Sequence, residues 1–165
     1  MNEVELRLPP DVAYVGIARL VVTAAARRHG LDDARAEDLK IAVSEATTNA
    51  ILAHQRVEEE QPIVLAFGPE AGQFQVLIRD TGPGFEPPPP DDPDTRDWTQ
   101  EGGLGVTVIR GLADEVMFVR ERGTCVDMKF SVELDNHDGA SDGNGSPDGD
   151  GSPAGSAFPR GDSSG

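Results

Sequence analysis

The sequence has little cysteine and little positive charge. Its single cysteine, Cys125, excludes a disulfide within the chain and a Cys-x-x-Cys metal site. Lysine and arginine number 14 against 30 aspartates and glutamates, so the formal net charge is −16. Because acidity of this size repels phosphate backbones and anionic lipid heads, we expect direct binding to neither nucleic acid nor a membrane surface.

Long apolar runs are also missing from the sequence. No stretch approaches the roughly 18 apolar residues that a membrane-spanning helix needs. The acidic first residues, 1–5, contain no apolar core of the length found in signal peptides. We therefore expect the protein to be cytoplasmic.

The chain divides into a part that should fold, residues 1–134, and a tail, residues 135–165. The tail holds eight of the nineteen glycines, and Phe158 is its only large apolar side chain. It can bury too little apolar surface to offset the entropy lost on ordering, so we expect disorder there. The first 134 residues are long enough to bury a core of their own.

Alternation and helical periodicity within 1–134 predict five strands and three helices. The strands are expected at residues 3–8, 62–67, 73–80, 116–120 and 124–134, and the helices at 12–29, from about 32 to between 54 and 57, and at 104–114. The first helix is expected to turn an apolar face inward, made of Val12, Val15, Ala18, Val22 and Ala25. A turn over residues 68–72 should join the second and third strands as a hairpin. This order predicts an α/β two-layer sandwich, with a mixed, mostly antiparallel sheet and the helices packed on one face.

Residues 85–101 follow no apolar period, and six of them are aspartate or glutamate. A segment of this length without its own secondary structure is usually a lid or a binding loop. We therefore expect a lid between the third strand and the third helix.

Glu45 and Asn49 are four residues apart, so they should project side by side from the second helix. The amide oxygen of Asn49 is a suitable ligand for Mg²⁺, and Glu45 could accept a proton from a hydroxyl or water that attacks a γ-phosphate. A solvated polar helix face would show the same pattern. The pair therefore indicates a metal and phosphate site only when it is combined with other sequence motifs.

Asp80 ends the third expected strand and precedes a turn that contains Gly82 and Gly84. Glycines let the backbone approach a flat ligand closely. The carboxylate could accept a hydrogen bond from the exocyclic amine of adenine, which the carbonyl of guanine at the same ring position could not give. A plain Asp-Thr-Gly turn between two elements is the other interpretation.

Gly102, Gly103, Leu104 and Gly105 stand at the start of the third expected helix. Free N–H groups and the positive end of the helix dipole would meet a phosphate there, although a hinge or an ordinary helix start has the same composition. The Walker spacing is absent from the sequence, and the dinucleotide pattern fails because Val108 replaces its last glycine. In so acidic a chain a triphosphate needs a cation to enter, and Mg²⁺ is the expected one.

Together and in this order, the three segments resemble the N, G1 and G2 boxes of the GHKL ATPases, the superfamily of gyrase, Hsp90, MutL and histidine-kinase catalytic domains. Residues 41–50 (IAVSEATTNA), 101–105 (EGGLG) and 113–116 (ADEV) look like those of the anti-sigma factor serine kinases of the RsbW type. The resemblance covers about residues 3–134. It implies a Bergerat ATP-binding fold, ATP and Mg²⁺ as cofactors, and a homodimer. It also implies two partners: a sigma factor of RNA polymerase, which is sequestered, and an anti-anti-sigma factor, which is phosphorylated on a serine.

The same resemblance assigns roles to individual residues. It implies Glu45 as the catalytic base and Asn49 as the metal ligand. The implied nucleotide contacts are Asn49, Asp80, Gly82, Gly84, Gly103, Leu104, Gly105 and Thr124, of which Asp80 reads adenine and Thr124 supports the adenine edge. Arg19, within the segment at 17–19, resembles a residue that contacts a protein partner.

Two positions depart from the family pattern. Ala53 stands where many relatives carry a histidine, so His54 is expected to be a helix-end residue outside the site. Gln100 and Glu101 stand where some relatives carry an arginine, so contact between the lid and phosphate would fall to Arg96 or be absent.

Three other functions remain open on the sequence. The chain could be a sequestering module that is gated by nucleotide and has little or no kinase activity. It could be the detached catalytic domain of a histidine kinase, which is disfavoured because the roughly forty residues before Glu45 are already used by a strand and a helix. It could also be an α/β binding domain that takes no nucleotide.

Overall fold

The computed structural model describes residues 4–84 and 103–132. The described elements are, in chain order, β1 (Val4–Leu8), the 3-10 helix η1 (Val12–Tyr14), α1 (Val15–Arg28), α2 (Asp33–Arg56), β2 (Ile63–Glu70), β3 (Gln73–Arg79), α3 (Gly103–Leu112), β4 (Glu115–Glu121) and β5 (Gly123–Ser131). The predicted lid at 85–101, Gly102 and the predicted tail at 135–165 lie outside the described residues.

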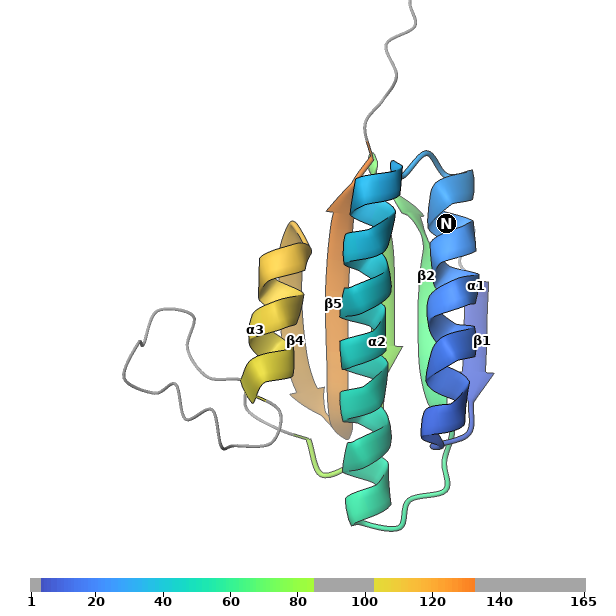
Figure 1. Cartoon of the computed structure of the whole chain (residues 1–165). Coiled ribbons are helices and arrows are strands. Elements are labelled where there is room, and N and C mark those ends of the chain that lie inside the picture. The colour runs from blue at the N-terminus through green and yellow to red at the C-terminus, as the bar shows by residue number, and fades with distance from the viewer. Residues whose placement is uncertain (1–3, 85–102, 133–165) are drawn as a thin grey trace, which may run out of the picture. The chain divides into compact units, whose positions relative to one another are not determined.

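The strands form one five-stranded sheet in the order β1-β2-β3-β5-β4. All four strand pairs are antiparallel, so the sheet is not mixed within the described ranges. The helices α1, α2 and α3 cover one face of the sheet (Figure 1). The predicted two-layer α/β sandwich is confirmed.

Alternation along the central strands places the core between the sheet and the helices. In β3, Phe74, Val76 and Ile78 are buried, whereas the residues between them are only half-buried. In β5, Met128 and Phe130 follow the same pattern, because successive side chains of a strand point to opposite faces. The helices therefore bury a single apolar face of an antiparallel sheet, as such sheets allow.

Helix α2 has the bounds that its sequence predicts. Asp32 caps it, since the side-chain oxygen accepts a hydrogen bond from the amide of Arg35, and 24 residues follow before the helix ends at Arg56. Its buried face includes Leu39, Val43 and Ala46, spaced for contact with the sheet. The length of α2 carries its last turns to the end of β3, where the candidate site lies.

Two local predictions are wrong. Residues 68–70 belong to β2 and not to a turn, because Pro69 pairs with Phe74 and the hairpin closes at Ala71 and Gly72, whose φ values are +47° and +82°. The missing N–H of Pro69 is tolerated there because the described pairing of β2 with β1 stops at Phe67. Val12, expected on an inward face, is 53% exposed, since it lies in η1 and not in α1.

Within residues 4–84 and 103–132, none of the helices combines the length and the apolar character that crossing a membrane requires.

Candidate active site

A pocket opens between α2, the end of β3 and the start of β5, and Ile109 of α3 and Phe118 of β4 also line it. Its walls include Asn49, Ala53, Ile78, Asp80, Gly84 and Thr124. Small-molecule sites usually combine apolar walls with a few polar groups, as this pocket does. Four of the predicted nucleotide contacts therefore line one cavity.

Asp80 is a fixed carboxylate on the wall of this pocket. It follows β3 and is 8% exposed, and its Oδ1 accepts hydrogen bonds from the amides of Gly82 at 2.9 Å and Thr124 at 3.2 Å. Burial raises the pKa of the Asp80 carboxyl above its ordinary value, although these two amides partly offset the effect. None of the described residues donates to Oδ2, which leaves that oxygen for a ligand.

Gly123 lets β5 approach Asp80. Its φ is +114°, and a Cβ built on it would lie only 2.0 Å from the carbonyl oxygen of Asp80. The amide of Asp80 donates to the carbonyl of Thr124 at 2.9 Å, which joins the two strands at this point. Only glycine fits this position, because any other residue would be both strained and in collision.

The turn after Asp80 packs against the last turns of α2. A Cβ on Gly82 would lie 3.1 Å from Cβ of Ala53, and Gly84, with φ of +71°, would meet the carbonyl oxygen of Gly123 at 3.2 Å. Both predicted turn glycines therefore stand where the backbone passes close to neighbouring atoms. The turn lies at the pocket, since Pro83 and Gly84 line it, and its role toward a base stays a prediction.

His54 supports this turn. This role was not predicted from the sequence. His54 is a helix-end residue as expected, but it is fully buried, and its Nε2 accepts a hydrogen bond from the amide of Thr81 at 2.8 Å. Because Nε2 accepts, the ring proton lies on Nδ1, which has no partner among the described residues. Helical spacing could have indicated its burial, because His54 follows Ala50 by four residues and so shares the buried face of α2.

Glu45 and Asn49 meet the start of α3. Both are half-buried on α2, and a Cβ built on Gly105 would lie 2.8 Å from Nδ2 of Asn49 and 3.1 Å from Oε2 of Glu45. Glycine at 105 thus allows the amino end of α3, whose first N–H groups have no partner within the helix, to approach a carboxylate and an amide. Gly103 begins the helix, and Leu104 is 59% exposed.

The structure brings eight of the nine residues predicted for the nucleotide site into two neighbouring groups, and it leaves Leu104 exposed. Asp80, Gly82, Gly84 and Thr124 form one end, called the base end because a base is predicted there, and Glu45, Asn49, Gly103 and Gly105 form the other end. Arg19 does not belong to either group, because it is exposed on α1.

The residues at the second end suit Mg²⁺. Within the described ranges no three His, Cys, Asp or Glu side chains cluster as a metal site. Mg²⁺ needs no such cluster, since it usually takes one or two protein oxygens together with substrate phosphates and water. The amide oxygen of Asn49, close to the carboxylate of Glu45 and the start of α3, would be a ligand of that kind.

Comparisons with known proteins agree with this geometry. Residues 8–130 match the family described as the histidine kinase-like ATPase domain. The chain is 33% identical over 134 residues to the serine-protein kinase RsbW of Oceanobacillus iheyensis, with 76% of this chain and 84% of that protein covered. The chain belongs to the RsbW family of serine-protein kinases.

Other RsbW proteins are similarly close. The RsbW of Bacillus velezensis is 35% identical over 137 residues, covering 78% of this chain and 84% of that protein, and the RsbW of Bacillus subtilis is 34% identical over 134 residues, covering 76% and 82%. A solved structure of the RsbU and RsbW domains of Rv1364c from Mycobacterium tuberculosis matches with a TM-score of 0.60. That match has 16% identity and covers 79% of this chain and 32% of the other, so it supports the fold alone. The chain is therefore a kinase on an ATP-binding fold of the histidine kinase-like type.

Proposed function

We propose that the pocket binds ATP together with Mg²⁺ and that the protein transfers the γ-phosphoryl group to a serine of a small antagonist protein. The observation that carries this proposal is the meeting of Glu45 and Asn49 with Gly105 at the amino end of α3. A carboxylate, an amide oxygen and free helix N–H groups in one place suit a triphosphate better than any neutral ligand.

At the base end, Asp80 is the proposed adenine reader. Its Oδ1 is occupied by two backbone amides, so Oδ2 would accept from the exocyclic amine of adenine. Guanine presents a carbonyl at that ring position, which would face the carboxylate without a proton between them. A site built to accept such a bond discriminates strongly against a ligand that lacks the donor.

At the phosphate end, Glu45 is the proposed general base. The serine Oγ bonds to the γ-phosphorus while the bond from that phosphorus to the bridging oxygen of ADP breaks, and the hydroxyl proton passes to Glu45. The N–H groups that open α3 stabilise the charge on the phosphoryl oxygens. Mg²⁺, held by Asn49 and by the phosphates, would offset negative charge on the triphosphate.

The proposed biological role is that of an anti-sigma factor. In this role the protein, as a homodimer, holds a cytoplasmic sigma factor away from RNA polymerase until an anti-anti-sigma factor of the STAS type competes for it. Arg19 is the proposed partner contact, supported by its exposure on α1 between Ile17 and Leu20, which are 47% and 66% exposed. The alternative is a sequestering module gated by nucleotide, with little or no kinase activity.

A phosphotransfer assay tests this function. The protein is incubated with Mg²⁺, γ-labelled ATP and the protein fraction that co-purifies with it, and phosphoserine is located by mass spectrometry. We expect transfer by the wild type, its loss in Glu45→Ala, and its retention in Glu37→Ala, a change on an exposed carboxylate of the same helix. Transfer by Glu45→Ala at the wild-type rate would show that Glu45 is not the base.

An experiment with the same co-purifying protein fraction distinguishes the kinase from the gated sequestering module. Capture of partners is measured with and without ATP alongside the transfer assay. Capture that depends on ATP, without any label on a partner, would support the gated module and contradict the kinase.

A further inference from the structure

Helix α3 has a sequence that forms a helix poorly on its own. Three of its ten residues are glycine, and four are β-branched: Val106, Thr107, Val108 and Ile109. A glycine costs about 1 kcal/mol relative to alanine inside a helix, and β-branched residues lose side-chain freedom there. The order and the position of α3 therefore depend on contacts with the rest of the fold.

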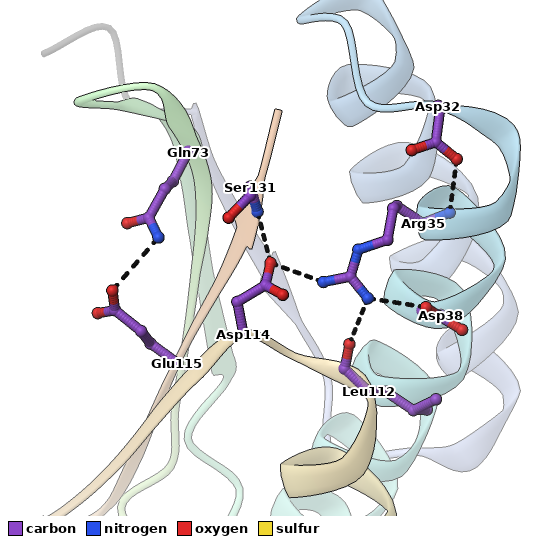
Figure 2. A network of polar contacts seen from close by, with 8 residues as sticks. All are labelled: Asp32, Arg35, Asp38, Gln73, Leu112, Asp114, Glu115 and Ser131. Carbon is purple, nitrogen blue, oxygen red and sulfur yellow. Dashed lines mark hydrogen bonds and ion pairs between the residues drawn. The ribbon is translucent and has the colours of Figure 1, made fainter. Parts of the chain in front are cut away.

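Arg35, in the first turn of α2, makes one of these contacts (Figure 2). Its Nη1 donates to the carbonyl oxygen of Leu112, the last residue of α3, at 2.9 Å, and to Oδ2 of Asp38 at 2.8 Å. Its Nη2 donates to Oδ2 of Asp114 at 2.6 Å, and the guanidinium lies over the ring of Phe130. Arg35 thus closes the carboxyl end of α3, where the helix dipole favours a cation.

Asp114 joins this contact to the sheet. Its Oδ2 also accepts from the amide of Ser131 at 2.6 Å, and its own amide donates to the carbonyl of Lys129 at 3.0 Å. Burial alone would raise the pKa of the Asp114 carboxyl, but the Ser131 amide and the Arg35 guanidinium outweigh that effect and lower the pKa below its ordinary value. At neutral pH the carboxylate is charged, so the network links α2, α3 and β5.

Both ends of α3 are therefore set against α2. Arg35 holds the carboxyl end, and at the amino end Gly105 packs against Asn49 and Glu45. A ten-residue helix spans about 15 Å and keeps that length through its own hydrogen bonds, so a slip at one end moves the other. The base end of the pocket is instead built on Asp80 and Thr124 at the ends of strands and on a turn that packs against α2, and α3 contributes only Ile109 to the described lining of the pocket.

We propose that Arg35 is a positioning residue for the triphosphate, because it fixes α3 along α2 and so sets the amino end of α3 against Asn49. This inference rests on the proposed ATP site. Arg35 itself touches no nucleotide. Replacing Arg35 should therefore weaken binding of the triphosphate and leave binding of adenosine unchanged.

The test compares MgATP and adenosine as ligands for the full chain. Arg35→Met keeps an apolar stem over Phe130 and removes the guanidinium. We expect MgATP to bind on the order of tenfold more weakly, the lower end of the losses seen when an outer partner of a binding group is removed. Adenosine should bind within about twofold of the wild type. The matched control is Arg27→Met, which removes ion pairs with Asp33 and Glu37 near the same end of α2, neither of which lies in α3.

Arg35→Lys is the second variant, in case Arg35→Met does not fold. Lysine keeps the charge but cannot span Leu112 and Asp114 as the planar fork does, so MgATP binding should again fall and adenosine binding should not. Unchanged MgATP binding in a folded variant would overturn the inference, and so would equal losses of MgATP and adenosine. If the wild type itself bound no MgATP, the proposed function would fail first.

Discussion

Alanine at Gly105 should separate ATP binding from folding. The new Cβ would lie 2.8 Å from Nδ2 of Asn49 and 3.1 Å from Oε2 of Glu45, whereas ordinary contacts begin at 3.4 Å. Asn49 must therefore move by roughly 0.6 Å or more, or α3 must move away from it. Because the atoms that collide are the ends of two side chains, rotation can relieve the contact at little cost to stability.

The expected magnitudes differ for the two properties. Alanine favours a helix over glycine by up to about 1 kcal/mol, so the free energy of unfolding should change by no more than about that amount. A misplacement of about 1 Å in a catalytic site can lower the rate by about 10²-fold, and we expect a loss of phosphotransfer of this order. Urea denaturation and the labelled transfer assay measure these two quantities, and calorimetric titration with MgATP measures binding.

Gly111→Ala is the matched control. Gly111 lies in the same helix, and a Cβ on it would have nothing within 4 Å. This variant should be as stable as the wild type or more so, and it should bind MgATP normally. Normal MgATP binding and transfer in Gly105→Ala, or an equal loss in Gly111→Ala, would refute the assignment of Gly105 to the phosphate end.

Two further variants probe the base end. Asp80→Asn should lose adenine binding, because the side-chain amide places an N–H donor where Oδ2 would accept. The variant should be at least as stable as the wild type at neutral pH, because burial penalises the charged carboxyl of Asp80. Burial raises the pKa of Asp80 in the folded state, so this gain in stability should disappear as the pH falls through that pKa. Adenosine binding to the wild type should weaken over the same pH range. Normal adenosine binding by Asp80→Asn would contradict the role of Asp80. Gly123→Ala should lower the unfolding free energy by about 3 kcal/mol or more, because the residue combines a φ of +114° with a Cβ 2.0 Å from the carbonyl oxygen of Asp80. A urea midpoint close to that of the wild type would show that β5 can move away from Asp80.

Local signals explain what the sequence could predict. The cap at Asp32 and the helical period set both ends of α2 within a residue or two, and the same period places Glu45 beside Asn49. Asp80 could be placed at the end of a strand because alternation runs through β3 up to that point. These features depend only on residues that are close in the sequence.

Pairing between distant segments explains what the sequence could not show. The length of β2 depends on its register with β3, which brings Pro69 opposite Phe74. Arg35 meets Leu112 and Asp114 across 77 and 79 residues of sequence, so no local pattern announces their contact.

Titration of the wild-type chain with ATP, with and without Mg²⁺, and with GTP as the comparison, tests the central claim most directly. The account predicts saturable binding of ATP that is strengthened by Mg²⁺, because Asn49 offers a metal ligand beside the start of α3. It also predicts that GTP binds at least about tenfold more weakly, because guanine has a carbonyl where adenine offers Asp80 an amine donor. Absence of any ATP binding at millimolar nucleotide with Mg²⁺ present, or equal binding of GTP, would contradict the account.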